Sequence, residues 1–317
     1  MRIWVVEDEK IGTANQALGL AMSLQLPFVR KKVVFNRWAA LPNCFKLSRT
    51  GIKNADVFLE SGEPPDIVIS AGRRLVNLVL AIKKKYGSKL IHLMNGGWYG
   101  RGGIDLVIVP KHDGLNITAA NVVSVSGTAH TLTAEKLADE KEKWQKQITV
   151  AGPAVAVIVG GSTKKHRFTE AMANDLVRLI RSKFKGYGVM LTTSRRTGDD
   201  NEKIIRDGLK DMNPYMYDFR RGGDNPYYAF LAMADGIVVT GDSMSMCSEA
   251  VFTGKRVFIY DPPALLSDKH RNFHRELYAG RHAVSFNDDA DIDFVPGKDI
   301  FYPNRDMINI IKERHLI

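Results

Sequence analysis

The chain has 317 residues, of which 44% are hydrophobic and 25% charged, as in soluble globular proteins. Two distant cysteines, no Cys-x-x-Cys motif and no run of 18 apolar residues argue against a disulfide framework, a zinc site and a membrane-spanning helix. The formal net charge of +10 favours a polyanionic partner, which could be a phosphorylated ligand, an acidic membrane surface or nucleic acid, although a basic excess also serves solubility alone.

Runs of β-branched and aliphatic residues alternate with helical patterns along the whole chain, which predicts parallel sheets with crossover helices. In the first half we predict strands at residues 2–7, 32–35, 66–70, 90–94, 105–109 and 122–125. Helices are predicted at residues 13–26 and 73–86.

The character of the chain changes at residues 133–147, where charges are dense and mixed. Leu137 and Trp144 are seven apart and predict a surface helix with one narrow apolar stripe. The breaker Ala151-Gly152-Pro153 follows. We therefore expect an N-terminal domain at residues 1–150 and a C-terminal domain at residues 151–317.

The second half repeats the alternation of strands and helices. Strands are predicted at residues 155–159, 188–192, 215–219, 236–240 and 256–260, and helices at residues 169–184, 200–212, 226–234 and 243–253. A last helix, at residues 304–315, could pack back on the N-terminal domain. The fold class is thus α/β, with two Rossmann-like parallel-sheet domains facing across a cleft, and ligands are expected at the carboxyl ends of the strands.

Two turns of the second half carry residues suited to a phosphate or a sugar. Gly160 and Gly161 allow close backbone approach, and Ser162 adds a hydroxyl. The next turn contains Thr193, Ser194 and Arg195, and arginine can clamp a phosphate with two hydrogen bonds. The alternatives are an ordinary glycine turn and a solvated basic turn.

A third turn opens the helix at residues 243–253. The free N–H groups at its start, with Ser243, Met244 and Ser245, would face an anion. Glu249 lies four residues after Ser245 on the same face and could accept ribose hydroxyls. Asn225 precedes the neighbouring helix. Asp242 would repel a phosphate, so we expect it to turn away and cap the helix.

In the first half, Gly12, Asn15 and Gln16 follow the first strand and would line the acceptor side of the cleft. His112 beside Asp113 could act as a general base, although a lone histidine is more often structural. A glycine-rich loop at residues 95–103 carries Trp98 and Tyr99, which could stack on a sugar or a lipid headgroup. The Asp-x-Asp pairs at residues 288–293 are interpreted as a solvated loop and not as a cation site.

Several of these motifs together resemble the ELM family, named for a plant mitochondrial-fission protein. The motifs are Asn225-Pro226-Tyr227, the run Val239-Thr240-Gly241-Asp242-Ser243-Met244-Ser245-Met246, Ser248-Glu249-Ala250, Gly160-Gly161-Ser162, Pro110-Lys111-His112-Asp113 and Gly12 with Asn15-Gln16. The ELM family in turn is similar to GT-B glycosyltransferases. That resemblance implies a C-terminal domain that holds a nucleotide sugar, with Gly160–Ser162 near the phosphates and Glu249 on the ribose.

The resemblance implies a metal-independent glycosyltransferase that uses a nucleoside-diphosphate sugar and no cofactor. Its acceptor is unknown and could be lipid-linked. The sequence departs from the GT-B pattern at two positions. Asp242 lies where the usual turn is glycine-rich, and Asn15 lies where that fold often has a histidine base. The catalytic base would then be Asp8, Glu9, His112 or Asp113. The alternatives are a non-catalytic membrane-associated adaptor with a GT-B-like fold and a nucleotide-sugar epimerase.

The cellular location that we expect for the protein depends on the lack of a signal-peptide pattern in the sequence. The apolar run at the N-terminus is too short for a signal peptide, so we expect a cytoplasmic protein, peripheral on the inner face of a membrane if the basic excess acts there. No interleaving of basic and aromatic residues indicates a nucleic-acid partner. The sequence leaves the sugar, the base, the acceptor, the stereochemistry and the oligomeric state open.

Overall fold

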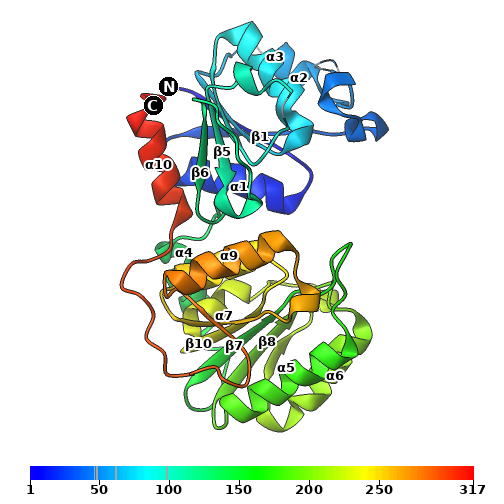
Figure 1. Ribbon diagram of the computed structural model, residues 1–317, viewed down its shortest axis with the longest axis vertical. Helices are drawn as coiled ribbons and strands as arrows, with labels where there is room; N and C mark the ends of the chain where they lie inside the picture. Colours follow the sequence, from blue (N-terminus) through cyan, green and yellow to red (C-terminus); the bar gives the residue numbers. More distant parts are fainter. Residues whose placement is uncertain (46, 48, 61–62, 98) are drawn as a thin grey trace. The chain divides into compact units, whose positions relative to one another are not determined.

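The computed structural model describes residues 1–317 except 46, 48, 61–62 and 98, so the predicted stacking residue Trp98 lies outside the described residues. The chain forms two compact units (Figure 1). Unit 1 comprises Met1–Thr131 with Tyr302–Ile317, and unit 2 comprises Leu132–Phe301.

Unit 1 contains a fully parallel sheet with the strand order β2-β1-β3-β4-β5-β6. Its strands are β1 (Ile3–Glu7), β2 (Phe28–Lys32), β3 (Ile67–Ala71), β4 (Lys89–Leu93), β5 (Leu106–Pro110) and β6 (Val122–Val125), and its helices are α1 (Ile11–Ser23), α2 (Asp56–Leu59), α3 (Val76–Tyr86) and α10 (Pro303–Glu313). Alternate residues of β1 enter opposite layers of the core: Ile3 and Val5 join the cluster of α1 and α10, and Trp4 and Val6 join that of α3. Burial of both faces explains the continuous apolar runs of the sequence.

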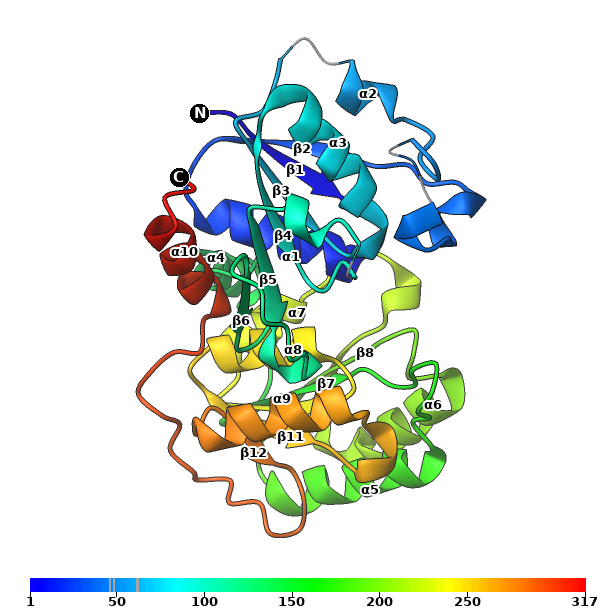
Figure 2. The same cartoon turned by 45° about the horizontal axis from the view of Figure 1, so that its top comes forward.

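Unit 2 repeats the plan with a parallel sheet of order β12-β11-β10-β7-β8-β9. Its strands are β7 (Ala154–Val159), β8 (Gly188–Thr193), β9 (Tyr215–Tyr217), β10 (Gly236–Thr240), β11 (Arg256–Tyr260) and β12 (Val284–Ser285), and its helices are α4 (Ala134–Trp144), α5 (Glu170–Lys183), α6 (Asp199–Gly208), α7 (Tyr227–Met233), α8 (Met244–Phe252) and α9 (Asp268–Ala279). Helices α5 and α6 cover one face, and α4, α7, α8 and α9 contribute to the core on the other (Figure 2).

The boundary between the units differs from the prediction at residue 150. Helix α4 belongs to unit 2 because its apolar stripe packs on α7, with Trp144 in the same core cluster as Phe230. The last helix, α10, belongs to unit 1, where it packs against α1. The Asn304 side chain fixes this contact, since its Nδ2 donates to the Gly19 carbonyl at 3.1 Å and to the His130 carbonyl at 2.9 Å.

Other differences concern the sheet edges and one polar helix. The second strand of unit 1 lies at residues 28–32 and not at 32–35, because an edge strand tolerates the charges of Arg30, Lys31 and Lys32. The sequence analysis missed α2, the two-residue edge strand β12 and helix α9, whose twelve residues are mostly polar or charged. The aspartate-rich segment at residues 288–293 lies outside helices and strands, as predicted, and Asp288 pairs with Arg178 at 2.5 Å.

Candidate functional site

The carboxyl ends of β7, β8 and β10 meet at one edge of the unit 2 sheet, and the turns that follow them are bonded to one another. After β7, the N–H groups of Gly160 and Gly161 donate to Thr240 Oγ1 at 2.7 Å and to Asp242 Oδ2 at 3.0 Å. The next N–H, that of Ser162, donates to the Arg196 carbonyl at 2.8 Å. The predicted phosphate loop therefore has its three N–H groups bound within the protein.

Both glycines of that loop are required by the neighbouring turns and not by a ligand. A Cβ on Gly160 would lie 2.4 Å from Asp242 Oδ2, and a Cβ on Gly161 would lie 2.2 Å from the Arg196 carbonyl oxygen. Gly161 also has a φ of +133°, which L side chains rarely adopt. The role expected for Gly160–Ser162, close approach to phosphate through the backbone, is thus replaced by close approach between the turns.

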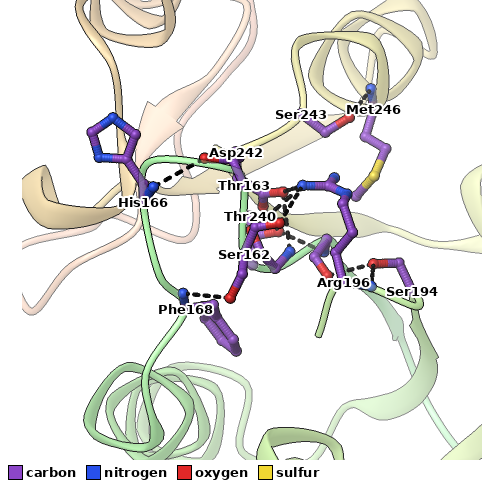
Figure 3. Close-up of polar contacts among 12 residues, drawn as sticks. Ser162, Thr163, His166, Phe168, Ser194, Arg196, Thr240, Asp242, Ser243 and Met246 are labelled. Atoms are coloured by element: carbon purple, nitrogen blue, oxygen red, sulfur yellow. Dashed lines mark hydrogen bonds and ion pairs between the residues drawn. The ribbon is translucent and has the colours of Figure 1, made fainter. Parts of the chain in front are cut away.

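Asp242 is the centre of this interlock (Figure 3). Its carboxylate has no exposed surface, accepts from Gly161 N–H and from Thr240 Oγ1 at 2.7 Å, and pairs with Arg196 Nη1 at 2.6 Å. The expectation that Asp242 caps the helix was wrong: Ser243 is the cap, with its Oγ accepting from Met246 N–H at 3.4 Å. Because Arg196 neutralises it, the carboxylate does not present a free negative charge to an anion at this edge.

Two residues of this network were not assigned a role from the sequence, Arg196 and His270. The pKa of His270, in α9, is lowered by burial, and the nearby Asp242 carboxylate acts against that shift. His270 Nδ1 also lies 2.7 Å from Ser267 Oγ, in the capping box that starts α9. The only signal in the sequence was the pair of adjacent arginines, Arg195 and Arg196. Nothing in the sequence showed that Arg196, and not Arg195, would pair with Asp242.

The turn after β8 separates the roles of the three residues predicted there. Thr193 is buried, and its hydroxyl donates to Glu202 Oε2 in α6 at 3.3 Å. Ser194 Oγ donates to the Gly160 carbonyl and accepts from Arg196 N–H at 3.1 Å. In the described part of the chain, the exposed Arg195 side chain makes no hydrogen bond or ion pair, so it remains available to a ligand.

Helix α8 starts at the same edge. Its first N–H groups, those of Met244 and Ser245, have no acceptor within the helix, and Ser245 is exposed beside them. Exposed cations follow β7 and β8 at this edge: Lys164, Lys165, Arg167 and Arg195. A helix N-terminus with several cations favours an anion such as a diphosphate.

Glu249 lies one turn further along α8 and is buried. Its Oε2 accepts from the Tyr227 hydroxyl at 2.7 Å, and its Oε1 faces the Tyr228 hydroxyl at 3.5 Å. Burial raises the pKa of Glu249, and the bond from Tyr227 acts in the opposite direction. The carboxylate is therefore already oriented by hydroxyl donors, the groups that a ribose would present to it.

Asn225 lies two residues before Tyr227, the first residue of α7. It is exposed, and its Oδ1 accepts from the Tyr227 N–H at 3.0 Å. Asn225 thus precedes α7, and Glu249 lies in α8 with its carboxylate next to the tyrosine hydroxyls of α7.

The residues predicted in unit 1 lie in two separate segments, helix α1 and the turn after β5. Gly12, Asn15 and Gln16 lie within the first half of α1, and Asn15 lines a pocket of about 340 Å³ with Asp8 and Arg30. His112 and Asp113 lie in a 3-10 turn directly after β5, where His112 is buried and Asp113 half-buried.

The carboxylates considered as alternative bases are engaged in unit 1. Asp8 accepts from the Arg74 guanidinium and from Lys10 N–H at 2.8 Å, and Glu9 Oε1 accepts from Phe35 N–H at 3.2 Å. His112 and Asp113, the other two residues considered as a base, directly follow the carboxyl end of β5. No group of three or more His, Cys, Asp or Glu side chains among the described residues is arranged to hold a metal ion.

A family model described as mitochondrial fission ELM1 matches residues 11–299 of the chain. The chain belongs to the mitochondrial fission ELM1 family. An uncharacterized protein of Rickettsia prowazekii is 30% identical over 326 residues, covering 91% of each protein. The mitochondrial fission protein ELM1 of Arabidopsis thaliana is 26% identical over 227 residues, which cover 62% of this chain and 51% of the plant protein. The match thus spans about half of that plant relative.

Solved structures show what this member of the ELM1 family has in common with other proteins. The UDP-GlcNAc 2-epimerase of Methanocaldococcus jannaschii aligns with a TM-score of 0.58 at 12% identity, over 99% of this chain and all of the epimerase. MurG of Acinetobacter baumannii aligns with a TM-score of 0.51 at 13% identity, over 99% and 91% of the two chains. At such identities the likeness is one of fold, and it confirms the predicted α/β class with two Rossmann-like, GT-B-like domains.

Proposed function

We propose that this protein is a metal-independent glycosyltransferase that moves a sugar from a nucleoside diphosphate to an acceptor hydroxyl. The observation that carries the proposal is the edge of the unit 2 sheet, where the start of α8 and Arg195 lie with other exposed cations. Structural neighbours support it, since the M. jannaschii epimerase was also solved with UDP-GlcNAc and UDP, aligning with a TM-score of 0.53.

The proposed donor site divides the nucleotide between three groups. The diphosphate is bound by the Met244 and Ser245 N–H groups, the Ser245 hydroxyl and Arg195. The ribose hydroxyls are bound by Glu249, with the Asn225 side chain beside it. The locked turns of Gly160, Ser194 and Asp242 hold these groups in place without bonding to the nucleotide.

The chemistry that we propose needs no metal ion. The acceptor oxygen attacks the anomeric carbon, the bond from that carbon to the diphosphate oxygen breaks, and the diphosphate leaves with the electron pair. Arginine, lysine and the α8 N-terminus stabilise the charge that develops on the leaving group. A base takes the acceptor proton, and we assign that role to Asp113 with His112, which follow β5.

A thermal-shift panel of nucleoside diphosphates and their sugars tests the donor site. A ligand at 100 times its dissociation constant stabilises the folded state by about 2.7 kcal/mol, which shifts the melting temperature of a protein of this size by several degrees. The proposal fails if no nucleotide and no nucleotide sugar shifts melting at millimolar concentration. Product analysis with a donor and lipid-extracted acceptors then tests the transfer itself.

A second candidate is a nucleotide-sugar epimerase, which is favoured by the full-length alignment with the M. jannaschii epimerase. An epimerase needs no acceptor. Incubation with the donor alone separates the two reactions, because only an epimerase converts the sugar under that condition.

A third candidate is a non-catalytic adaptor that keeps the fold and binds a partner, which is favoured by the name of the family. The adaptor predicts that Glu249→Ala leaves the cellular phenotype intact while changes on the charged surface of α4 abolish it. The transferase predicts the reverse.

We also propose that the protein works on the cytoplasmic face of an acidic membrane, where a lipid-linked acceptor would be found. The net charge of +10 supports this location. No helix in the described part of the chain is long and apolar enough to cross a membrane. Attachment would therefore use the protein surface.

A further inference from the structure

The described residues between 36 and 51, which are 36–45, 47 and 49–51, lie in a loop that leaves the sheet of unit 1 after β2 and returns before α2. Its ends are held together, because Asn36 N–H donates to the Gly51 carbonyl at 3.0 Å and Phe35 pairs with Ile52 in an antiparallel bridge. A surface loop whose ends meet is an Ω-loop, and we use that name for these described residues. The Ω-loop projects from the sheet of unit 1 in both ribbon views (Figures 1 and 2).

The inner side of the Ω-loop is anchored to unit 1. Asn43 is buried, and its Nδ2 donates to the carbonyl oxygens of Arg73 at 3.1 Å and Gly96 at 3.2 Å. The Arg73 guanidinium in turn donates to the Leu41 carbonyl at 2.9 Å and to that of Ala40 at 3.2 Å. These bonds cross between the Ω-loop and the turns after β3 and β4, so the loop has a defined side that faces the protein.

The Ω-loop also exposes large apolar side chains. Trp38 is 50% exposed, Phe45 75% and Leu47 80%, and Val57 in the adjoining α2 is 52% exposed. Scattered exposed hydrophobic residues are ordinary, but a cluster marks an interaction surface. Of the twelve large hydrophobic side chains found exposed in the described residues, ten are in unit 1 and three of those lie within ten consecutive positions of this loop.

The charges around this apolar surface are positive. The Arg37 guanidinium lies over the Trp38 ring, 4.9 Å from its centroid, and Lys53 follows the loop without an ion pair in the described part of the chain. The nearby acidic residues, Asp56 and Glu60, both pair with Arg49, at 2.6 and 3.1 Å. The three cations Arg37, Arg49 and Lys53 thus outnumber the two carboxylates, and Arg37 and Lys53 are the cations that would meet an anionic surface.

We propose that the Ω-loop docks the protein on an anionic lipid bilayer. Trp38, Phe45 and Leu47 enter the interfacial layer, where tryptophan is favoured, and Arg37 and Lys53 face the lipid phosphates. The combination of projecting aromatic and aliphatic residues with adjacent cations matches this partner, since a bilayer needs no complementary groove. The inference rests on the membrane location proposed above and not on the sugar-transfer reaction.

Vesicle co-sedimentation tests the Ω-loop with the full chain. The test variant carries Trp38→Ser, Phe45→Ser and Leu47→Ser, and the matched control carries Val295→Ser and Ile300→Ser, two exposed apolar positions of unit 2. We expect the wild type and the control to bind vesicles of phosphatidylglycerol and phosphatidylcholine. The affinity of the test variant for these vesicles should be lower by about 10-fold or more. Arg37→Gln with Lys53→Gln should weaken binding and its dependence on salt.

Fluorescence places the contact independently. Trp4 and Trp144 are buried, so in a Trp98→Phe background the emission that changes on vesicle binding should come from Trp38. We expect a blue shift and quenching by brominated lipid.

The inference is overturned if wild-type protein does not bind anionic vesicles, if the test variant binds as well as the control, or if the emission does not change on binding. Dimers of the wild type that the test variant abolishes, without vesicle binding, would assign the surface to self-association and also overturn it. Melting temperature and nucleotide binding of the test variant should equal those of the control. If vesicle binding follows the prediction and no nucleotide binds, only the sugar-transfer proposal fails.

Discussion

The carboxyl edges of the two sheets share one feature, a buried ion pair, and differ in the groups that surround it. Each edge holds a buried carboxylate paired with an arginine: Asp8 with Arg74 in unit 1, and Asp242 with Arg196 in unit 2. In unit 2 the pair is surrounded by further cations and by the start of α8, whereas unit 1 has a second carboxylate, Glu7, paired with Arg30. The two sheets differ in strand order and in the groups around these pairs. At the edge of unit 2 the exposed Lys164, Lys165, Arg167 and Arg195 lie in turns at the same edge as the start of α8, an arrangement that suits a diphosphate.

The largest expected effect comes from the contact between the turns after β7 and β8 in unit 2. Gly161→Ala would place a methyl group 2.2 Å from the Arg196 carbonyl oxygen at a φ of +133°, so we expect a loss of about 4 kcal/mol in the free energy of unfolding. The matched control is Gly186→Ala, where φ is +84° and no atom lies within 4 Å, and where we expect a loss of about 1 kcal/mol. Equal losses in urea unfolding would refute the interlock of the turns.

Unit 1 has its own buried polar group, His92 in β4, which makes its stability depend on pH. The ring is fully buried, with Nδ1 2.8 Å from Ser70 Oγ, and burial lowers its pKa from 6.5 to about 4. The unfolded chain therefore takes up the proton first as the pH falls. The free energy of unfolding therefore has its full value above pH 6.5. It falls as the pH is lowered from 6.5 to 4, by about 3 kcal/mol in total. Urea unfolding of His92→Leu should show a flatter profile over that range, and an unchanged slope would contradict the assignment.

The ion pair of Asp242 is expected to contribute less, since Arg196 is partly exposed. Asp242→Asn leaves Arg196 without its partner beside the locked turns and should cost about 2 kcal/mol of stability. The control is Asp268→Asn, which breaks the exposed pair with Arg271 and should cost about 0.5 kcal/mol or less. If both variants unfold at the same urea concentration, Asp242 is not the centre of the network.

The smallest expected change in free energy, that of Arg195→Gln, concerns ligand binding and therefore tests the proposed function. Arg195→Gln should leave the melting temperature unchanged and weaken the binding of a nucleoside diphosphate about 10-fold, or about 1.4 kcal/mol. Arg181→Gln is the control, because Arg181 lies at the other end of α5 and donates to the Gly208 carbonyl. Calorimetric titration of both variants with UDP checks the difference, and equal affinities would remove Arg195 from the site.

Much of the fold could be predicted because strands buried on both faces form continuous apolar runs. Strands β10 and β11 have the predicted bounds for this reason. Strand β6 also has the predicted bounds, although it lies at an edge and only Val125 is buried. Strand β2 was misplaced because its charges are tolerated only at an edge, and the sequence does not say which strand is at an edge. The domain boundary was misplaced because the charged surface of α4 is visible in the sequence, whereas its packing on α7 is not.

The site was predictable only in part. Turn chemistry located the edge of unit 2, since glycine and serine after buried strands are a local signal. The pairing of Asp242 with Arg196 joins turns 46 positions apart, and no local pattern records which of two adjacent arginines meets a carboxylate. The same limit applies to Thr193, which points to Glu202, and to Glu249, whose tyrosine partners come from another helix.

Hydrogen exchange at the start of α8 tests the central claim most directly. With UDP added, the amides of Met244 and Ser245 should exchange more slowly, because they would donate to the diphosphate. The amides of Gly160 and Gly161 should change little, since they are already bonded to Thr240 and Asp242. The same experiment on Arg195→Gln should require about 10-fold more UDP. No protection of Met244 and Ser245 at millimolar UDP would contradict the assignment of this edge to a nucleotide.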